Sequence, residues 1–184
     1  VLTGGGRTGA FLAATVLGFE PDVVALAKGL ASGYPVSAVA ATAELGSAAA
    51  WAAAGGISST YGGSAVPLAA AEATLTELAA LTIDLTALSA VFAEGLDKIA
   101  RARCVGEVRQ LGLLGAIELV SDPDSRRPAP ELADRVVTAA ADRGVRVLPG
   151  SHVLRLAPPL VIEPDQLRDG LAVLAEVLAE LDAG

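Results

Sequence analysis

The order of short apolar runs and helical segments constrains the fold of this chain more than any other feature. Residues 23–27 form a short apolar run that ends before Gly29, and residues 38–41 form a second run. Both runs have the length and composition of buried strands. A helical segment over 43–54 follows, and a longer helix is expected to begin after Ser64, which can serve as its N-cap. Strands that alternate with helices are typical of an α/β fold.

The pattern changes after residue 80. Apolar residues at three- and four-residue steps from Leu85 to Ile99 predict an amphipathic helix that faces a core. The segment VGEVRQLGLLGAIELV that starts at Val105 predicts two strands, interrupted by Gly112 and Gly115. A polar loop then precedes a helix over about 130–143.

The last part of the chain predicts two short strands and a final helix. The strands lie in VRVLP and HVLRLAP, and Pro164 is placed to open the helix in its first turn. The buried stripe of this helix is predicted to consist of Leu167, Leu171, Leu174, Leu178 and Leu181. We therefore predict a domain boundary near residue 80, with an α/β portion over 1–80 and a smaller α+β domain over 81–184.

Composition excludes several classes of function. The 184 residues are 53% hydrophobic, which is enough for a sizeable core, and the net charge is −8. This acidic balance argues against nucleic-acid binding, because phosphates are bound by clustered Lys and Arg. No apolar run reaches the roughly 18 residues of a membrane span. The single cysteine, Cys104, permits no intrachain disulfide, which favours a reducing cytoplasm.

Lys28 is the residue whose surroundings are most unusual for its type. Only two lysines occur, and Lys98 lies on the polar face of an amphipathic helix, whereas Lys28 follows VVALA and precedes GLASG. Burial of an unpaired ammonium favours the neutral, nucleophilic amine, which is what a Schiff-base lysine requires. The alternative from the residues alone is a strand-end lysine that extends its amine to solvent.

Five segments place Lys28 in a wider context. They are GGGRTGAF at 4–11, PDVVALAKGLASGYPVSAV at 21–39, SSTYGG at 58–63, VRQLGLLGAIEL at 108–119 and VLRLAPPLVI at 153–162. Together, and in this order, they resemble the class III aminotransferases. These are pyridoxal-phosphate (PLP) enzymes of fold type I that act mainly on ω-amines and on amino acids such as ornithine derivatives and 4-aminobutyrate.

The resemblance covers nearly the whole chain but only about the second half of a family member. It implies that 1–80 is the C-terminal part of the PLP-binding large domain and that 81–184 is the small C-terminal domain. Val1 matches the valine of the family's Asp-Glu-Val-Gln motif, and Leu2 stands at the position of its glutamine. We therefore expect the chain to be truncated at its N-terminus.

The resemblance also assigns roles to residues. Lys28 matches the lysine that holds the cofactor as an internal aldimine and moves a proton between the substrate α-carbon and the cofactor's aldehyde carbon. Thr60, with Ser59 beside it, matches the site that binds the cofactor phosphate of the partner subunit in a homodimer. Arg155 matches an arginine that pairs with a substrate carboxylate; an ordinary structural ion pair is an equally weighted alternative.

The implied reaction is transamination between an amino acid or ω-amine and a 2-oxo acid in a cytoplasmic enzyme. Racemase, aminomutase or decarboxylase activity in the same family, and a non-catalytic remnant of the fold, remain alternatives. No metal site is expected, because the only histidine, His152, has no accompanying ligand pattern.

Overall fold

The computed structural model describes residues 1–182 and separates the chain into two compact units. The first unit is Val1–Thr82, and the second begins at Ile83. The division lies two residues beyond the boundary that the sequence pattern places near residue 80. Each unit has its own sheet, and no strand of one unit pairs with a described strand of the other.

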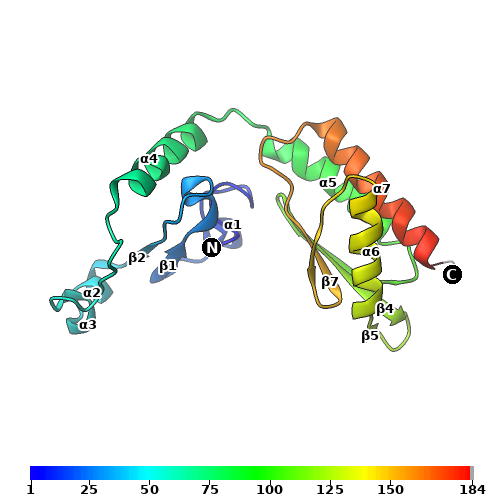
Figure 1. Cartoon of the computed structure of the whole chain (residues 1–184), viewed down its shortest axis with the longest axis horizontal. Helices are drawn as coiled ribbons and strands as arrows, with labels where there is room; N and C mark the ends of the chain where they lie inside the picture. Colours follow the sequence, from blue (N-terminus) through cyan, green and yellow to red (C-terminus); the bar gives the residue numbers. More distant parts are fainter. Residues whose placement is uncertain (183–184) are drawn as a thin grey trace. The chain divides into compact units, whose positions relative to one another are not determined.

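The first unit contains a two-stranded sheet with short helices and one long helix (Figure 1). Strands β1 (Val23–Leu26) and β2 (Ala38–Ala41) pair antiparallel, with Val23 opposite Ala41 and Leu26 opposite Ala38. The helical elements are α1 (Ala13–Leu17), the 3₁₀ turn η1 (Lys28–Ala31), α2 (Ala43–Gly46), α3 (Ala49–Ala52) and α4 (Ala65–Ala80).

The predicted helix over 43–54 is wrong, because the segment forms two separate helices of one turn each. The Ser47 hydroxyl donates to the Glu44 carbonyl at 2.8 Å, and Ala48 has an extended ψ of 144°. Such a local side-chain bond offers the backbone an alternative to a continuous helix. Helix α4 does begin directly after Ser64, but the Ser64 side chain forms no capping hydrogen bond. Ser64 therefore occupies the predicted N-cap position but lacks the hydrogen bond that a capping side chain makes.

The first unit buries little of its own apolar surface. Its buried side chains are all small: Thr8, Ala14, Ala31 and Ala71. Large apolar residues are instead exposed, among them Tyr61 at 85% and Ile57 at 65%. Exposed apolar surface of this extent is typical of regions that bind another protein segment or subunit.

The second unit is a sheet covered on one face by helices (Figure 1). The strand order is β3-β4-β7-β6, all antiparallel, and β5 pairs with β4. The strands are β3 (Val105–Leu111), β4 (Leu114–Asp122), β5 (Arg127–Pro128), β6 (Leu148–Gly150) and β7 (Val153–Leu156), and the helices are α5 (Leu85–Ile99), α6 (Pro130–Asp142) and α7 (Pro164–Asp182).

The core of the second unit lies between the sheet and these helices. Phe92 and Leu96 of α5 meet Ile117 of β4 and Leu154 of β7 in one buried cluster. The predicted stripe of α7 is confirmed at four buried leucines, and Leu181 is partly buried at the margin. This arrangement is the α+β architecture that the sequence predicts for the second portion.

Gly115 does not interrupt a strand, in contrast to the prediction. It lies inside β4, and only Gly112 and Leu113 separate β3 from β4. A Cβ atom added at Gly115 would stand 2.7 Å from Cζ of Phe92. The glycine therefore makes room for the aromatic ring, which is a common reason for glycine within a strand.

Candidate active site

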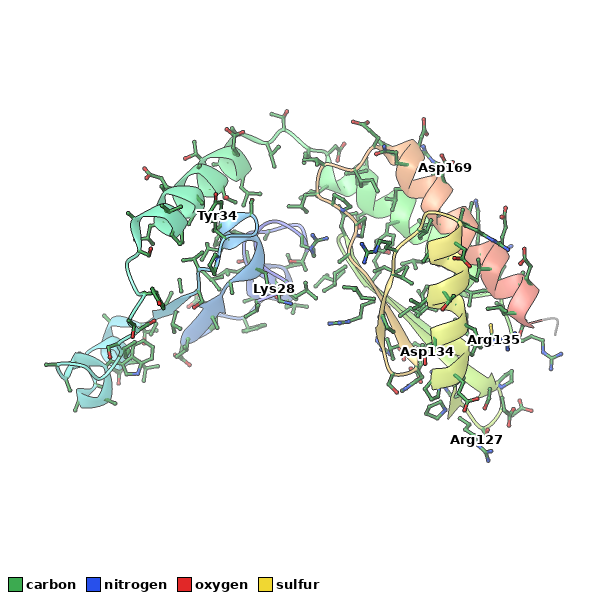
Figure 2. All side chains as sticks on the ribbon, in the orientation of Figure 1. Lys28, Tyr34, Arg127, Asp134, Arg135 and Asp169 are labelled. Atoms are coloured by element: carbon green, nitrogen blue, oxygen red, sulfur yellow. The ribbon has the colours of Figure 1, made fainter. Side chains whose placement is uncertain are left out.

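Lys28 is the first residue of η1, directly after the end of β1 and Ala27 (Figure 2). It is exposed in the described chain, so the apolar burial predicted for it is not found. The physical reason is that β1 pairs with β2 alone and its residues alternate between exposed and half-buried. A strand without cover on both faces cannot bury the side chain that follows it.

The turn that presents Lys28 has an unusual backbone. Lys28 has φ 55° and Ser32 has φ 47°, so two residues other than glycine lie in the left-handed region. This region is disfavoured for residues with a Cβ atom, and such outliers persist where the surrounding structure holds them. Within the turn, Leu30 N donates to Ala27 O at 3.2 Å and Tyr34 N donates to Ala31 O at 3.1 Å.

Helix α4 packs against this turn. Ala31 is fully buried, and η1 and α4 are in contact. The hydroxyl oxygens of Ser32 and Thr74 lie 3.2 Å apart, and the Thr74 hydroxyl donates to Ala70 O at 2.7 Å. Sequence reasoning did not identify Ser32 or Thr74. The available signal was two hydroxyl residues, Thr74 and Thr76, at the middle of an alanine-rich helix.

The Ser59–Thr60 segment forms an exposed glycine-rich turn. Gly62 N donates to Ser59 O at 3.0 Å, and Gly63 adopts φ 76°. Over residues 1–182, the N–H groups of Thr60, Tyr61 and Gly63 make no hydrogen bond. Free backbone donors beside two hydroxyls suit a phosphate. A Cβ at Gly62 would lie 3.1 Å from Ser59 O, so the tight turn favours glycine there. The donor set therefore fits the phosphate of PLP.

The GGGRTG segment forms a compact loop at the start of the first unit. Gly5 N donates to Phe11 O at 2.9 Å, and the buried Thr8 hydroxyl donates to Thr3 O at 3.3 Å. Burial lowers the pKa of the Arg7 guanidinium from its ordinary value. These bonds are internal to the loop, which agrees with a structural role for this motif.

Arg155 lies in the second unit, on the face of the sheet opposite to the helices. Its neighbours across the strands are Ala116 of β4 and Leu148 of β6. Arg155 is exposed, and within the described residues its side chain forms no hydrogen bond or ion pair. The structural ion pair considered as an alternative for Arg155 is therefore not observed here.

Arg109 on the same sheet face differs from Arg155. Its guanidinium lies 2.5 Å from Glu107 and 3.4 Å from Glu118, and His152 lies 3.8 Å from the other oxygen of Glu118. The guanidinium of Arg109 is therefore paired with the carboxylates of Glu107 and Glu118. Of the two arginines, Arg155 is the one whose donors remain available for an external carboxylate.

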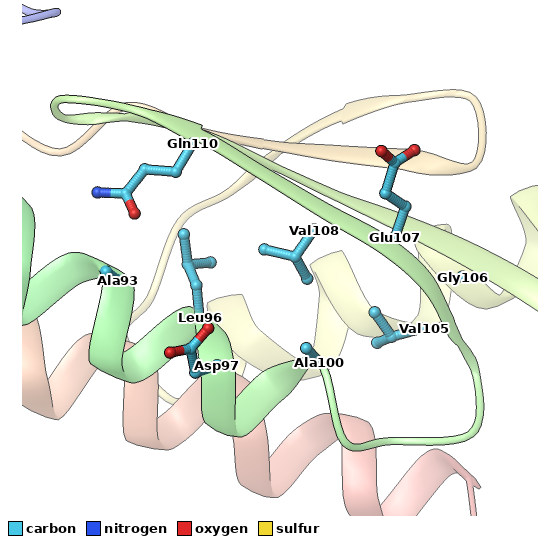
Figure 3. A pocket seen from close by; sticks show the side chains of 9 residues that line it. All are labelled: Ala93, Leu96, Asp97, Ala100, Val105, Gly106, Glu107, Val108 and Gln110. Atoms are coloured by element: carbon cyan, nitrogen blue, oxygen red, sulfur yellow. The ribbon is translucent and has the colours of Figure 1, made fainter.

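Three cavities of the second unit are lined by none of the predicted site residues. One, of about 350 Å³, lies between α5 and β3 and is lined by Asp97, Glu107, Gln110 and apolar side chains (Figure 3). The Gln110 amide nitrogen already donates to Ser89 O and Gly112 O, each at 2.9 Å. The amide nitrogen of Gln110 is therefore already satisfied within the second unit.

Two further properties concern the described part of the chain. Residues 1–182 contain no cluster of three His, Cys, Asp or Glu side chains that could hold a metal ion. In the same range no single helix is long and apolar enough to cross a membrane. Helices α4 and α5 together have the length and apolar composition of a span, but they are separate helices with a break between them.

Cys104 is expected to be an unreactive thiol. It is only 6% exposed, and burial, followed by the charge of Asp182, raises its pKa to about 11. The folded state therefore retains the proton, so this thiol's contribution to stability is lost as pH rises from about 9, the unfolded value, to about 11. We expect alkylation by iodoacetamide to accelerate near pH 11 in the native protein. Acceleration near pH 8.5, as for an exposed thiol, would contradict this.

The arrangement of a lysine-bearing turn after a strand, a glycine-rich phosphate-type turn and a separate α+β unit is that of fold type I transaminases. A solved structure described as a transaminase with L-Ala superposes with a TM-score of 0.88 at 26% identity, over 100% of this chain and 46% of that one. An adenosylmethionine-8-amino-7-oxononanoate aminotransferase from Methanocaldococcus jannaschii gives 0.85 at 29% identity, over 97% and 44%. The predicted fold class is confirmed.

The chain belongs to the class III aminotransferase family, whose model matches residues 1–178. It is 40% identical to a 5-aminovalerate aminotransferase of Pseudomonas aeruginosa, over 98% of this chain and 43% of that protein. It is 36% identical to a 4-aminobutyrate aminotransferase of Escherichia coli, over 98% and 43%. The chain thus spans less than half the length of these relatives. Members of the family depend on PLP.

Proposed function

We propose that the protein containing this chain catalyses PLP-dependent transamination between an amino acid or ω-amine and a 2-oxo acid. The observation that carries the proposal is the position of Lys28, exposed on a strained turn directly after β1, within a chain of this family. The exposed amine is open to reaction with an aldehyde, whereas the burial that would favour its neutral form is not supplied by the described residues. We further propose a cytoplasmic homodimer.

Each predicted residue has a defined task in this proposal. When bound, PLP supplies an electron sink that stabilises charge developing at the substrate α-carbon. Lys28 Nζ would hold the cofactor's aldehyde carbon until the substrate amine displaces it. The freed Nζ would then take the proton from the substrate α-carbon and return it at the aldehyde carbon.

Thr60 and Arg155 would act in binding rather than in proton transfer. The Thr60 hydroxyl, with Ser59 and the free backbone N–H groups of the turn, would bind the cofactor phosphate, as the family resemblance implies for a partner subunit's cofactor. The unpaired guanidinium of Arg155 would donate two hydrogen bonds to a substrate carboxylate. Both tasks use donors that the chain leaves unoccupied.

The direct test is to trap the lysine–cofactor bond. The protein is incubated with PLP, reduced with borohydride, and the added mass is located by peptide mass spectrometry. We expect the label on Lys28, and its loss in the Lys28→Ala variant. Lys98, also exposed, provides an internal comparison. A label spread evenly over Lys98 and the terminal amine, or none, would overturn the proposal.

A further inference from the structure

We infer that Thr74 of α4, through Ser32, is a positioning residue for the Lys28 amine. The inference rests on the proposed function of Lys28 and adds a residue pair that sets how its side chain is presented. Neither hydroxyl is proposed to touch the cofactor or substrate. Their role is to hold the backbone of the turn in the conformation from which Lys28 extends.

The turn is anchored differently on its two sides. On its N-terminal side, the strand pairing of β1 with β2 extends to Leu26, which is paired with Ala38, and only Ala27 separates Leu26 from Lys28. On its C-terminal side, the only side-chain hydrogen bond that joins the turn to another described element is the one between Ser32 and Thr74. These residues are 42 positions apart in the sequence, so the bond is a tertiary contact.

The two hydrogen bonds of the Thr74 hydroxyl have different directions. The Thr74 hydroxyl has one hydrogen, and the shorter contact, 2.7 Å to Ala70 O, uses it within α4. The Ser32 hydroxyl can therefore supply the hydrogen for the 3.2 Å contact to Thr74 Oγ1. The bond to Ala70 fixes the orientation of Thr74, so that an oriented acceptor faces Ser32.

The bond between Ser32 and Thr74 is linked to Lys28 through the backbone of the turn. Ser32 and Lys28 are the two left-handed residues that bracket the turn, with Ala31 fully buried between them. A left-handed conformation of a residue other than glycine persists only where contacts impose it. Loss of the Thr74 bond lets Ser32 relax, and relaxation at one end of the five-residue segment 28–32 redirects the residue at its other end. The direction of the exposed Lys28 side chain has few other constraints.

The experiment compares Thr74→Val with Thr76→Val as a matched control. Thr76 lies on the same helix, and its hydroxyl donates only to Glu72 O of α4, at 2.9 Å. The readout is the rate of PLP attachment to Lys28, measured by borohydride trapping and peptide mass spectrometry. A net hydrogen bond corresponds to about a two- to tenfold change in such a rate. We expect that loss in Thr74→Val, recovery in Thr74→Ser, and a rate unchanged from wild type in Thr76→Val.

Further variants separate positioning from general destabilisation. Ser32→Ala should slow attachment as much as Thr74→Val, and the double variant should be no slower than either single one, since both remove the same bond. Thermal unfolding midpoints should differ between Thr74→Val and Thr76→Val by no more than the loss of one net hydrogen bond. If wild-type protein labels Lys28 and Thr74→Val labels it equally fast, the positioning role is overturned while the proposed function stands. If wild-type protein does not label Lys28, the proposed function itself fails.

Discussion

Transamination by the Lys28→Ala variant is expected to be slower than by the wild type by on the order of 10³-fold or more, as when a covalent catalytic group is removed from other enzymes. The variant loses both the amine that would hold the cofactor and the base that would move the α-proton. The measurement is single-turnover kinetics, with the cofactor in excess so that weaker binding does not limit the rate. The loss should appear in the rate at saturating substrate.

Two comparison variants make this expectation specific. Lys28→Arg keeps a positive charge but cannot lose its proton, so it should be as inactive as Lys28→Ala if the amine acts as nucleophile and base. Lys98→Ala should retain wild-type activity, because Lys98 is an exposed residue in the last turn of α5 and has no role in the proposed site. Substantial activity in Lys28→Arg would show that only the charge matters and would contradict the role assigned to Lys28.

The second large effect is expected in the core of the second unit. Phe92→Ala should lower the free energy of unfolding of this unit by about 3–5 kcal/mol, the usual range for removal of a buried aromatic ring. Phe92 is only 1% exposed and fills the space above Gly115, where even an added Cβ would lie 2.7 Å from the ring. Removal of the ring leaves a cavity bounded by a strand that cannot easily move inward. Urea unfolding monitored by circular dichroism measures the change.

The chain provides a matched control for this substitution. Phe19 of the first unit is 55% exposed, so Phe19→Ala should change the unfolding free energy by less than about 0.5 kcal/mol. Phe92→Leu should fall between the two, since it retains part of the ring's volume. A loss below about 1 kcal/mol in Phe92→Ala would mean that the core closes over the cavity, contrary to the packing described above.

The second unit was largely predictable from its sequence. The periodicity of Leu85–Ile99, the proline that opens α7 and the leucine stripe of α7 are local patterns, and each produced the expected element. The role of Gly115 was not predictable. Glycine is needed at this position because the ring of Phe92, 23 positions earlier in the chain, packs against it. The local sequence does not distinguish a glycine that ends a strand from a glycine that lies within a strand beneath an aromatic ring.

The first unit was less predictable. Its structure depends on local side-chain hydrogen bonds and on how few other segments of the described chain pack over its strands. The Ser47 bond to Glu44 helps to end a helix that alanine content alone would extend. The apolar run before Lys28 suggested a buried amine, yet β1 has only β2 beside it in the described chain, and Lys28 is exposed. An apolar sequence indicates a preference for burial, but other segments must supply the cover.

The sequence by itself indicated the family and, through the resemblance to it, the residues proposed for the chemistry. Lys28, Ser59, Thr60 and Arg155 were named because the order of the motifs matches that of the family. Only the tertiary structure decided how those groups are presented. It placed the Lys28 turn against α4, joined Ser32 to Thr74 across 42 positions, and left Arg155 unpaired while Arg109 is neutralised by two glutamates. Contacts between distant segments depend on the folded path of the chain, which local patterns do not encode.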